Sequence, residues 1–271
     1  MPKLLFCDID GTLVRKDGTI SDHVRNLLNE LARNGHGFIL TSGRPLSSIL
    51  KVRDYIDIAF PHSYIIANNG GLVYDCNAAK AVFEARLPLS VIDRLQAVAE
   101  EMNIHIQTYT ESSIVCKAET EEVLRYAGRI KMPVILSDNL TAPLTIPPFK
   151  MLALSLKGSE ALMPLKRRIE QDFGDIVNPM FSQDGYLEIL PKEAGKGLAL
   201  HFLCNLLDIS VSDTYAAGDS ENDITMLREA GTSYAMQNAD ETVKSSAAFV
   251  TALDHEHDGI AEVINAVLAN S

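Results

Sequence analysis

The chain has 271 residues, 46% of them hydrophobic and 22% charged, which is the composition of a globular protein with a sizeable core and excludes a disordered chain. Its 24 Lys and Arg against 36 Asp and Glu give a formal net charge of −12 and a pI near 5.0, which argues against general binding to nucleic acid or to an anionic membrane. No apolar run is long enough to span a membrane, and the short apolar start ends at Asp8, so we expect a cytoplasmic protein without a signal peptide.

The first part of the chain alternates short apolar runs with amphipathic helical patterns. Ser21 is a typical N-cap residue before one helix, Gly35 follows the end of that helix, and Pro45 opens the next helix. Strands joined by helices in this way form a parallel sheet. The expected strands cover residues 4–9, 38–41 and 64–67.

The pattern changes between residues 83 and 189, where strands follow one another without an intervening helix. Adjacent strands of this kind are typical of a mixed or antiparallel sheet, which indicates a separate small α/β domain. We expect helices over residues 90–102, 120–131 and 159–173, and strands over residues 104–110, 113–117, 151–156 and 186–190.

The first pattern resumes after the insertion, with helices over residues 196–207, 221–230 and 260–268 and strands over residues 214–217, 233–236 and 249–251. The predicted fold class is therefore α/β, a doubly wound, Rossmann-like parallel sheet with an inserted α/β domain. Residues 1–82 and 190–271 form the core in this interpretation, and residues 83–189 form the insertion.

The four cysteines lie far apart and form no Cys-x-x-Cys pair, which favours free thiols over a disulfide or a zinc site. Cys7 precedes Asp8 in the first expected strand, so the Cys7 side chain should face the opposite side of the sheet, in the core. The other three are Cys76, Cys116 and Cys204.

Polar residues gather where the expected parallel strands end, which is where open α/β sheets bind their ligands. The chain places Asp8-Ile9-Asp10-Gly11-Thr12, Ser42-Gly43-Arg44, Asn69-Gly70 and Gly218-Asp219-Ser220-Glu221-Asn222-Asp223 at these ends, with Lys196 at the start of a helix. Carboxylates packed together repel one another, so a cation is needed, and oxygen-rich sites suit Mg²⁺. A carboxylate held in such a site can attack an electrophilic phosphorus, whose oxygens need the positive groups nearby.

These motifs, in this order and spacing, resemble those of the haloacid dehalogenase superfamily of aspartate-dependent phosphohydrolases. The closest resemblance is to its Cof-like subfamily, in which an α/β cap of type IIB is inserted into the core. Asp258-Gly259-Ile260 also matches this subfamily. The resemblance extends over the whole chain and implies a phosphatase, a phosphoric monoester hydrolase, that requires Mg²⁺ and acts on a small phosphorylated metabolite such as a sugar phosphate.

The resemblance also implies a role for each motif residue. Asp8 would be the nucleophile that forms an aspartyl-phosphate, and Asp10 would protonate the leaving alcohol and then accept a proton from water. The implied Mg²⁺ ligands are the Asp8 carboxylate, Asp219 and the backbone carbonyl of Asp10. The implied phosphate-binding groups are Ser42, Lys196, Asn222 and the backbone N–H groups of Ile9 and Gly43. Asp223 would support the metal or Lys196, while Arg44 and Asn69 are candidate substrate contacts.

Simpler structural roles stay open for several of these residues. Thr41 competes with Ser42 for the hydroxyl role, Arg44 could form a surface ion pair, and Asn69 could serve only the turn. The segments 254–258 and 166–168, which are rich in metal-ligating and basic side chains respectively, fit a solvated loop and a solvated helix face better than binding sites.

Two other functions remain open besides the phosphatase. A phosphomutase of the phosphomannomutase type would need a second phosphate site in the insertion, but residues 83–188 carry 11 Lys and Arg against 15 Asp and Glu, which does not favour one. A non-catalytic module that binds a phosphorylated ligand would be expected to lose catalytic side chains, and here they are all present. The physiological substrate and the oligomeric state cannot be predicted from the sequence.

Overall fold

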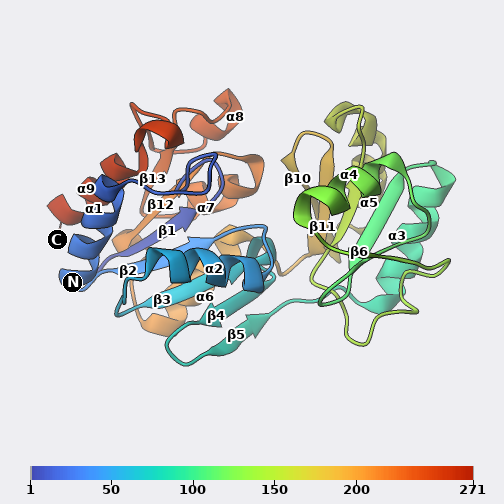
Figure 1. Cartoon of the computed structure of the whole chain (residues 1–271), viewed down its shortest axis with the longest axis horizontal. Helices are drawn as coiled ribbons and strands as arrows, with labels where there is room; N and C mark the ends of the chain where they lie inside the picture. The colour runs from blue at the N-terminus through green and yellow to red at the C-terminus, as the bar shows by residue number, and fades with distance from the viewer. Residues whose placement is uncertain (1, 271) are drawn as a thin grey trace. The chain divides into compact units, whose positions relative to one another are not determined.

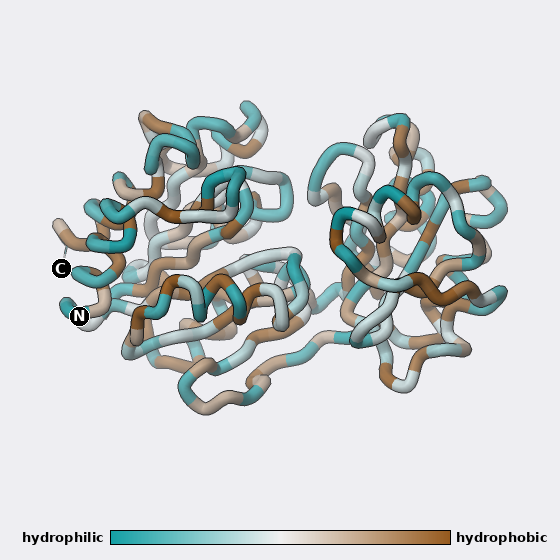
Figure 2. Tube along the Cα trace, in the orientation of Figure 1, coloured by the Kyte–Doolittle hydropathy of each residue, from teal (hydrophilic) through white to brown (hydrophobic). Residues whose placement is uncertain are grey.

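The computed structural model describes residues 2–270, which fold into two compact units joined by two chain crossings (Figure 1). The first unit, called the core unit here, contains Met1–Glu84 and Ala194–Ser271. The second, the inserted unit, contains Ala85–Glu193. In Figure 2 apolar stretches run through the interior of each unit, while the turns between elements are mostly polar.

The core unit is built on an eight-stranded sheet in the order β14-β13-β12-β1-β2-β3-β4-β5. Neighbouring strands from β14 to β3 are parallel, and only the β3–β4 and β4–β5 pairs are antiparallel. This topology confirms the predicted doubly wound α/β class. The strands are β1 (Leu4–Asp8), β2 (Gly37–Thr41), β3 (Ser63–Ala67), β4 (Leu72–Asp75), β5 (Lys80–Glu84), β12 (Thr214–Gly218), β13 (Thr232–Ala235) and β14 (Phe249–Val250).

Alternation along β1 decides which side chains face which helices. Leu4 and Phe6 belong to one buried cluster with Leu200 and Leu203 of α6 (Lys196–Leu207), so the side of the sheet that Asp8 shares with them faces α6. Cys7 is fully buried and points the other way, as expected. The remaining helices of the unit are α1 (Asp22–Arg33), α2 (Leu46–Ile56), α7 (Ile224–Glu229), α8 (Glu241–Lys244) and α9 (Ile260–Ala269), with α1 packed on α9.

The inserted unit contains a six-stranded sheet in the order β10-β11-β9-β6-β7-β8, in which only β7 and β8 pair in parallel. One face packs against α3 and α5 and the other against α4, so each face has its own apolar cluster. The strands are β6 (His105–Tyr109), β7 (Ile114–Cys116), β8 (Val134–Leu136), β9 (Met151–Leu154), β10 (Val177–Gln183) and β11 (Tyr186–Pro191), and the helices are α3 (Leu89–Glu101), α4 (Glu121–Ile130) and α5 (Met163–Phe173).

The local signals in the sequence correspond to real caps. The Ser21 side chain accepts a hydrogen bond from the Val24 backbone N–H at the start of α1, and Gly35 follows α1 with a positive φ of 80°. All four cysteines are free thiols, as predicted. Among the described residues, none of the helices has the length and apolar character needed to cross a membrane.

The sequence did not indicate five of these elements, namely β4, β5, β8, β10 and α8. The expected helix over residues 221–230 is also divided, because it starts as the 3₁₀ turn η4 (Glu221–Asp223) and continues as α7. Likewise, the helix expected over residues 159–173 starts with the 3₁₀ turn η2 (Ser159–Leu162) before α5.

Candidate active site

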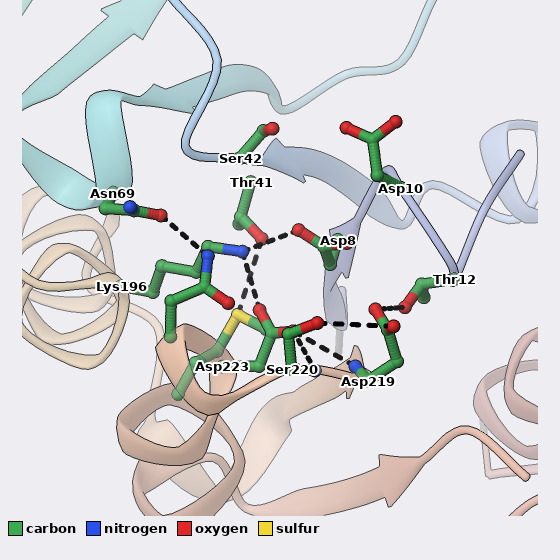
Figure 3. A network of polar contacts seen from close by, with 12 residues as sticks. Asp8, Asp10, Thr12, Thr41, Ser42, Asn69, Lys196, Asp219, Ser220 and Asp223 are labelled. Atoms are coloured by element: carbon green, nitrogen blue, oxygen red, sulfur yellow. Dashed lines mark hydrogen bonds and ion pairs between the residues drawn. The ribbon is translucent and has the colours of Figure 1, made fainter. Parts of the chain in front are cut away.

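The candidate site lies where β1, β2 and β12 end and where α6 begins, all within the core unit (Figure 3). Asp8 is the last residue of β1. Its side chain lies on the same face of the sheet as that of Phe6, so its carboxylate points toward the first turn of α6. Lys196, the first residue of α6, is completely buried there. A lysine is almost never fully buried unless it is paired, so its partners define the site.

Lys196 is held between two carboxylates. Its Nζ donates to Oδ1 of Asp8 and to Oδ1 of Asp223, at 2.6 Å in each case. Asp8 belongs to the first strand and Asp223 to the turn after β12, so the lysine joins two distant parts of the chain. The sequence prediction that Asp223 supports Lys196 agrees with this contact.

The turn after β12 is organised by the other oxygen of Asp223. Oδ2 accepts hydrogen bonds from the backbone N–H groups of Asp219 and Ser220, at 3.0 and 3.1 Å. Asp223 therefore has both oxygens engaged, whereas within residues 2–270 the carboxylate of Asp219 accepts only from the hydroxyls of Thr12 at 3.1 Å and Ser220 at 3.3 Å. Gly218 makes this tight turn possible, because a Cβ there would lie 2.5 Å from the Asp223 Cβ.

The pKa values reflect this crowding of buried carboxylates. Burial raises the pKa of Asp8 well above its ordinary value, because the attraction of Lys196 does not offset it. Burial, together with the charge of Asp223, raises the pKa of Asp219 to about 7. Burial alone would lower the pKa of Lys196, but Asp223 and Asp8 outweigh that effect and raise it. For both carboxyls, the single lysine does not offset the effect of burial on the pKa.

A divalent cation fits this donor set. Asp8, Asp219 and Asp223 can each offer one oxygen, and those three atoms lie within 4.8 Å of one another. It is the only such group of metal-ligating side chains among residues 2–270. Since Lys196 and two backbone N–H groups already occupy Asp223, the oxygens best placed for a cation belong to Asp8 and Asp219.

Asp10 does not join this carboxylate cluster. Its side chain is 59% exposed and lies apart from Asp8 and Asp219 in Figure 3. Its two oxygens are bound by Arg44, with Nε donating to Oδ2 at 2.7 Å and Nη2 donating to Oδ1. Thus the structure places Arg44, predicted as either a substrate contact or an ion-pair residue, in an ion pair with Asp10.

The expected phosphate-binding residues lie beside the cluster, on the loops after β2 and β3. Both residues are buried, but the Ser42 hydroxyl accepts from the Arg44 backbone N–H at 3.2 Å, whereas the competing hydroxyl of Thr41 donates its proton to the Met226 sulfur at 3.6 Å. Gly43 lies against the Asn69 amide, where a Cβ would be 3.0 Å from Nδ2. Ser42 is thus better placed than Thr41 to meet a ligand.

Asn222 and Asn69 are linked to each other. Asn222 donates from Nδ2 to Oδ1 of Asn69 at 2.9 Å, and both residues are buried. Oδ1 of Asn222 is buried and has no hydrogen-bond partner among the described residues. An unpaired buried acceptor costs free energy, so this atom is left for a donor from a bound molecule. Ile9, the other expected contributor of a backbone N–H, is also fully buried.

Two residues that the sequence prediction left without a role help to build the site. Thr12 donates to Asp219, and Asn238 donates from Nδ2 to the Gly11 carbonyl at 2.9 Å, which fixes the turn after Asp8. Thr12 could have been noticed, since it belongs to the same motif as Asp8 and Asp10. Asn238 carries no comparable signal, because it stands alone far along the chain.

The two charged segments with open interpretations make structural contacts. In segment 254–258, Asp258 accepts from Arg15 at 2.9 Å and from the Ser21 hydroxyl at 2.7 Å, so the segment supports the loop after β1. In segment 166–168 on α5, Lys166 pairs with Glu170 one helical turn away, and Arg168 pairs with Asp172 in the same way.

Comparisons with known proteins agree with this fold and site. The model of the haloacid dehalogenase-like hydrolase family matches residues 5–264. "Putative phosphatase YxeH" of Bacillus subtilis is 26% identical over 269 residues, which is 98% of each chain. The 5-amino-6-(5-phospho-D-ribitylamino)uracil phosphatase YwtE of the same organism is 26% identical over 98% of each chain. The crystal structure of a haloacid dehalogenase-like hydrolase from Bacteroides thetaiotaomicron is 28% identical, with a TM-score of 0.83, and covers 98% of this chain and 100% of its own.

Two features define the class of protein. A parallel sheet carries three clustered carboxylates where its strands end, and a second sheet is inserted into the chain. The chain belongs to the haloacid dehalogenase-like hydrolase family. The predicted family is thereby confirmed, and so is the prediction that the chain is a hydrolase. The names of its relatives agree with the predicted enzyme class, a phosphoric monoester hydrolase.

Proposed function

We propose that this chain is a Mg²⁺-dependent phosphatase that hydrolyses a small phosphomonoester through an aspartyl-phosphate on Asp8. The observation that carries the proposal is the Asp8 carboxylate, which is buried at the end of β1 and bound through one oxygen to Lys196. A carboxylate fixed in this way can offer an oxygen that lies within 4.8 Å of an oxygen of Asp219, where a cation would bind. That arrangement suits attack on phosphorus once a bound cation balances the carboxylates.

The charge of the site supports a divalent cation. Three carboxylates and one lysine leave a net charge of −2 when all four are ionised, and an anionic phosphoryl group would be repelled by it. Asp8 and Asp219, with the Asp10 backbone carbonyl, would hold Mg²⁺. When bound, the ion neutralises the carboxylates and polarises the phosphoryl oxygens.

The residues of the chain would then carry out two half-reactions. In the first, an Asp8 oxygen forms a bond to phosphorus while the ester bond breaks, and Asp10 gives its proton to the leaving alkoxide. In the second, a water oxygen attacks the same phosphorus, the bond to Asp8 breaks, and the Asp10 carboxylate takes the proton from the water. Ser42, Lys196, Asn222 and the N–H groups of Ile9 and Gly43 would bind the phosphoryl oxygens throughout.

The core unit supplies all of these residues, so the inserted unit would act as the cap that selects the leaving group. The named substrate of the YwtE relative, a phosphorylated ribitylamino-uracil, is a phosphomonoester of a small metabolite and suggests the same substrate class for this chain. Within that class, selection can rest on a few contacts worth about 1–3 kcal/mol each. The inserted unit has no excess of Lys and Arg, which favours a hydrolase over a mutase that must hold a second phosphate.

The test is phosphate release from p-nitrophenyl phosphate in the presence of Mg²⁺ by the wild type and by Asp8→Asn. The wild type should release phosphate, EDTA should stop it, and Asp8→Asn should abolish it because an amide cannot form the aspartyl-phosphate. Glu241→Gln, which changes an exposed carboxylate on α8 of the same unit, is the matched control and should keep wild-type activity. Equal activity in Asp8→Asn and in the control would refute the nucleophile assignment.

A further inference from the structure

Arg44 and Asp10 form a two-point contact that neither residue's predicted role requires. The guanidinium approaches through Nε and Nη2, so that each donates to a different oxygen of the Asp10 carboxylate. Among the described residues, Arg44 is the partner of both oxygens. A two-point fork fixes the plane and the direction of a carboxylate, whereas a single contact would let it rotate.

The backbone of Arg44 is itself anchored in the candidate site. Its N–H donates to the Ser42 hydroxyl at 3.2 Å, and its carbonyl accepts from the Asn68 N–H at 3.0 Å. Arg44 also precedes Pro45, the N-cap of α2, which restricts the conformation of the arginine. The guanidinium therefore extends from a fixed point on the loop after β2 to the loop after β1.

Asp10 needs such a restraint. Its side chain is 59% exposed, and the turn that follows it contains Gly11 with a positive φ of 84°. An exposed carboxylate on a turn samples several rotamers, and each rotamer points its oxygens in a different direction. The fork selects one of them.

The contact also fixes the direction of the Asp10 oxygens. The second half-reaction needs a carboxylate held in one direction, because in that step Asp10 takes a proton from one attacking water. A substrate phosphate could contact Nε and Nη2 of Arg44 only by displacing Asp10.

We propose that Arg44 is a positioning residue that holds the Asp10 carboxylate as the base for hydrolysis of the aspartyl-phosphate, an inference that rests on the proposed function above. In that step the water oxygen bonds to phosphorus and the bond from phosphorus to Asp8 breaks. The water proton passes to Asp10, and inorganic phosphate and the free Asp8 carboxylate result. Arg44 takes no part in the bond changes and acts only on the orientation of Asp10.

The kinetics of p-nitrophenyl phosphate separate this role from a substrate contact. Nitrophenolate leaves readily without a proton, so formation of the aspartyl-phosphate needs little help from Asp10, and kcat/KM reports that formation. Arg44→Gln should therefore leave kcat/KM nearly unchanged and lower kcat and KM together. Misplacing a catalytic group can cost up to about 100-fold, and we expect a fall in kcat of about 10-fold or more. Stopped-flow measurement should show a burst of about one nitrophenolate per enzyme before the slow phase.

Four further variants complete the experiment. Arg44→Lys should recover only part of kcat, since an ammonium cannot reproduce the fork. Arg53→Gln, which removes an exposed arginine paired with Asp54 on α2, is the matched control and should keep wild-type kinetics. In an Asp10→Asn background, Arg44→Gln should have no further effect on kcat, because there is no carboxylate left to orient.

The outcomes separate the alternatives. A rise in KM with a fall in kcat/KM, persisting in the Asp10→Asn background, would make Arg44 a substrate contact and overturn the proposal. A loss of both parameters together with a lowered Tm would make Arg44 a structural residue and overturn it as well. A wild type that turns over no phosphomonoester refutes the proposed function, and the positioning role falls with it. That failure is distinguishable, since it appears before any substitution is made.

Discussion

Replacing Lys196 with methionine tests whether this lysine is the counter-ion on which the folded core unit depends. The substitution keeps a long unbranched side chain but removes the charge that lies 2.6 Å from both Asp8 and Asp223. Two buried carboxylates would then face one another without a cation. Breaking a buried ion pair by removing one partner costs about 3–5 kcal/mol, because the remaining charge is left uncompensated.

The expected loss is large enough to measure by thermal unfolding. For a folding unit of this size class, 1 kcal/mol corresponds to a Tm change of about 2–4 °C, so Lys196→Met should melt roughly 6–20 °C below the wild type in EDTA at pH 8. Lowering the pH to 5.5 should narrow this difference, since burial raises the pKa of Asp8 and protonation of Asp8 removes the repulsion in the variant. In the wild type the positive charge of Lys196 already offsets this repulsion at both pH values, because the pKa of Lys196 is raised.

The matched control for this experiment is Lys244→Met. Lys244 pairs with an almost fully exposed Glu241 on α8, so the loss should stay below about 1 kcal/mol at either pH. If Lys196→Met unfolded within the same margin as this control, and with the same pH dependence as the wild type, the buried lysine would not be a counter-ion and the reasoning about the site would fail.

Two further predictions concern backbone fit and pH. Gly70→Ala should lower both Tm and kcat, because Gly70 has a φ of 93° and a Cβ there would lie 2.3 Å from the Gly195 carbonyl oxygen, next to Lys196. Gly128→Ala, inside α4 with open space around it, should instead raise the free energy of unfolding by about 0.5–1 kcal/mol. A destabilised Gly128→Ala would contradict the inference that the space around a glycine Cβ decides the effect of the substitution. Burial, with Asp223 nearby, raises the pKa of Asp219 to about 7, so the stability that this carboxyl contributes is complete below its ordinary pKa and is lost as the pH rises through 7. Asp219→Asn should therefore lose less stability than the wild type between pH 5.5 and 8 in urea unfolding with EDTA, and parallel pH profiles would refute the shift.

The sequence predicted the parallel part of the core sheet because buried parallel strands are continuous apolar runs and their ends carry distinct motifs. The run that ends at Asp8 is such a case, and the α6 side chains that pack against it follow the expected pattern. Alternation alone also placed Cys7 in the core and Asp8 toward the site. This part of the candidate site could be predicted since it depends only on strand period and strand order.

Three of the four missed strands, β5, β8 and β10, lie at sheet edges, where the sequence signal is weakest. β10 contains Pro179, which argues against a strand in the middle of a sheet, but β10 is the first strand of its sheet and an edge tolerates proline. β5 is largely exposed, and β8 has only three residues at the opposite edge of the inserted sheet. β5 and β8 are too exposed to produce the apolar run on which the prediction relied, and in β10 Pro179 and polar residues interrupt that run.

The Arg44–Asp10 fork illustrates what spacing cannot predict. Strand order brings the loops after β1 and β2 together, so the proximity of these two residues could be foreseen. Their pairing could not be foreseen, because the long Arg44 side chain and the exposed Asp10 side chain can each adopt rotamers that point elsewhere. The same motif residues can therefore support a substrate contact or an internal contact, and only the geometry decides.

The acidic character of the chain is consistent with an anionic substrate once the site is considered by itself. The net charge of −12 is that of the whole chain, whereas the candidate site itself holds three carboxylates and a single lysine. With the proposed Mg²⁺ in place, the site would be neutral while the surrounding protein stays negative. A phosphorylated metabolite would then gain most of its attraction from the ion, Lys196 and backbone N–H groups at short range. Affinity should accordingly depend on Mg²⁺ far more than on ionic strength, because short contacts in a buried site are screened much less than surface charges.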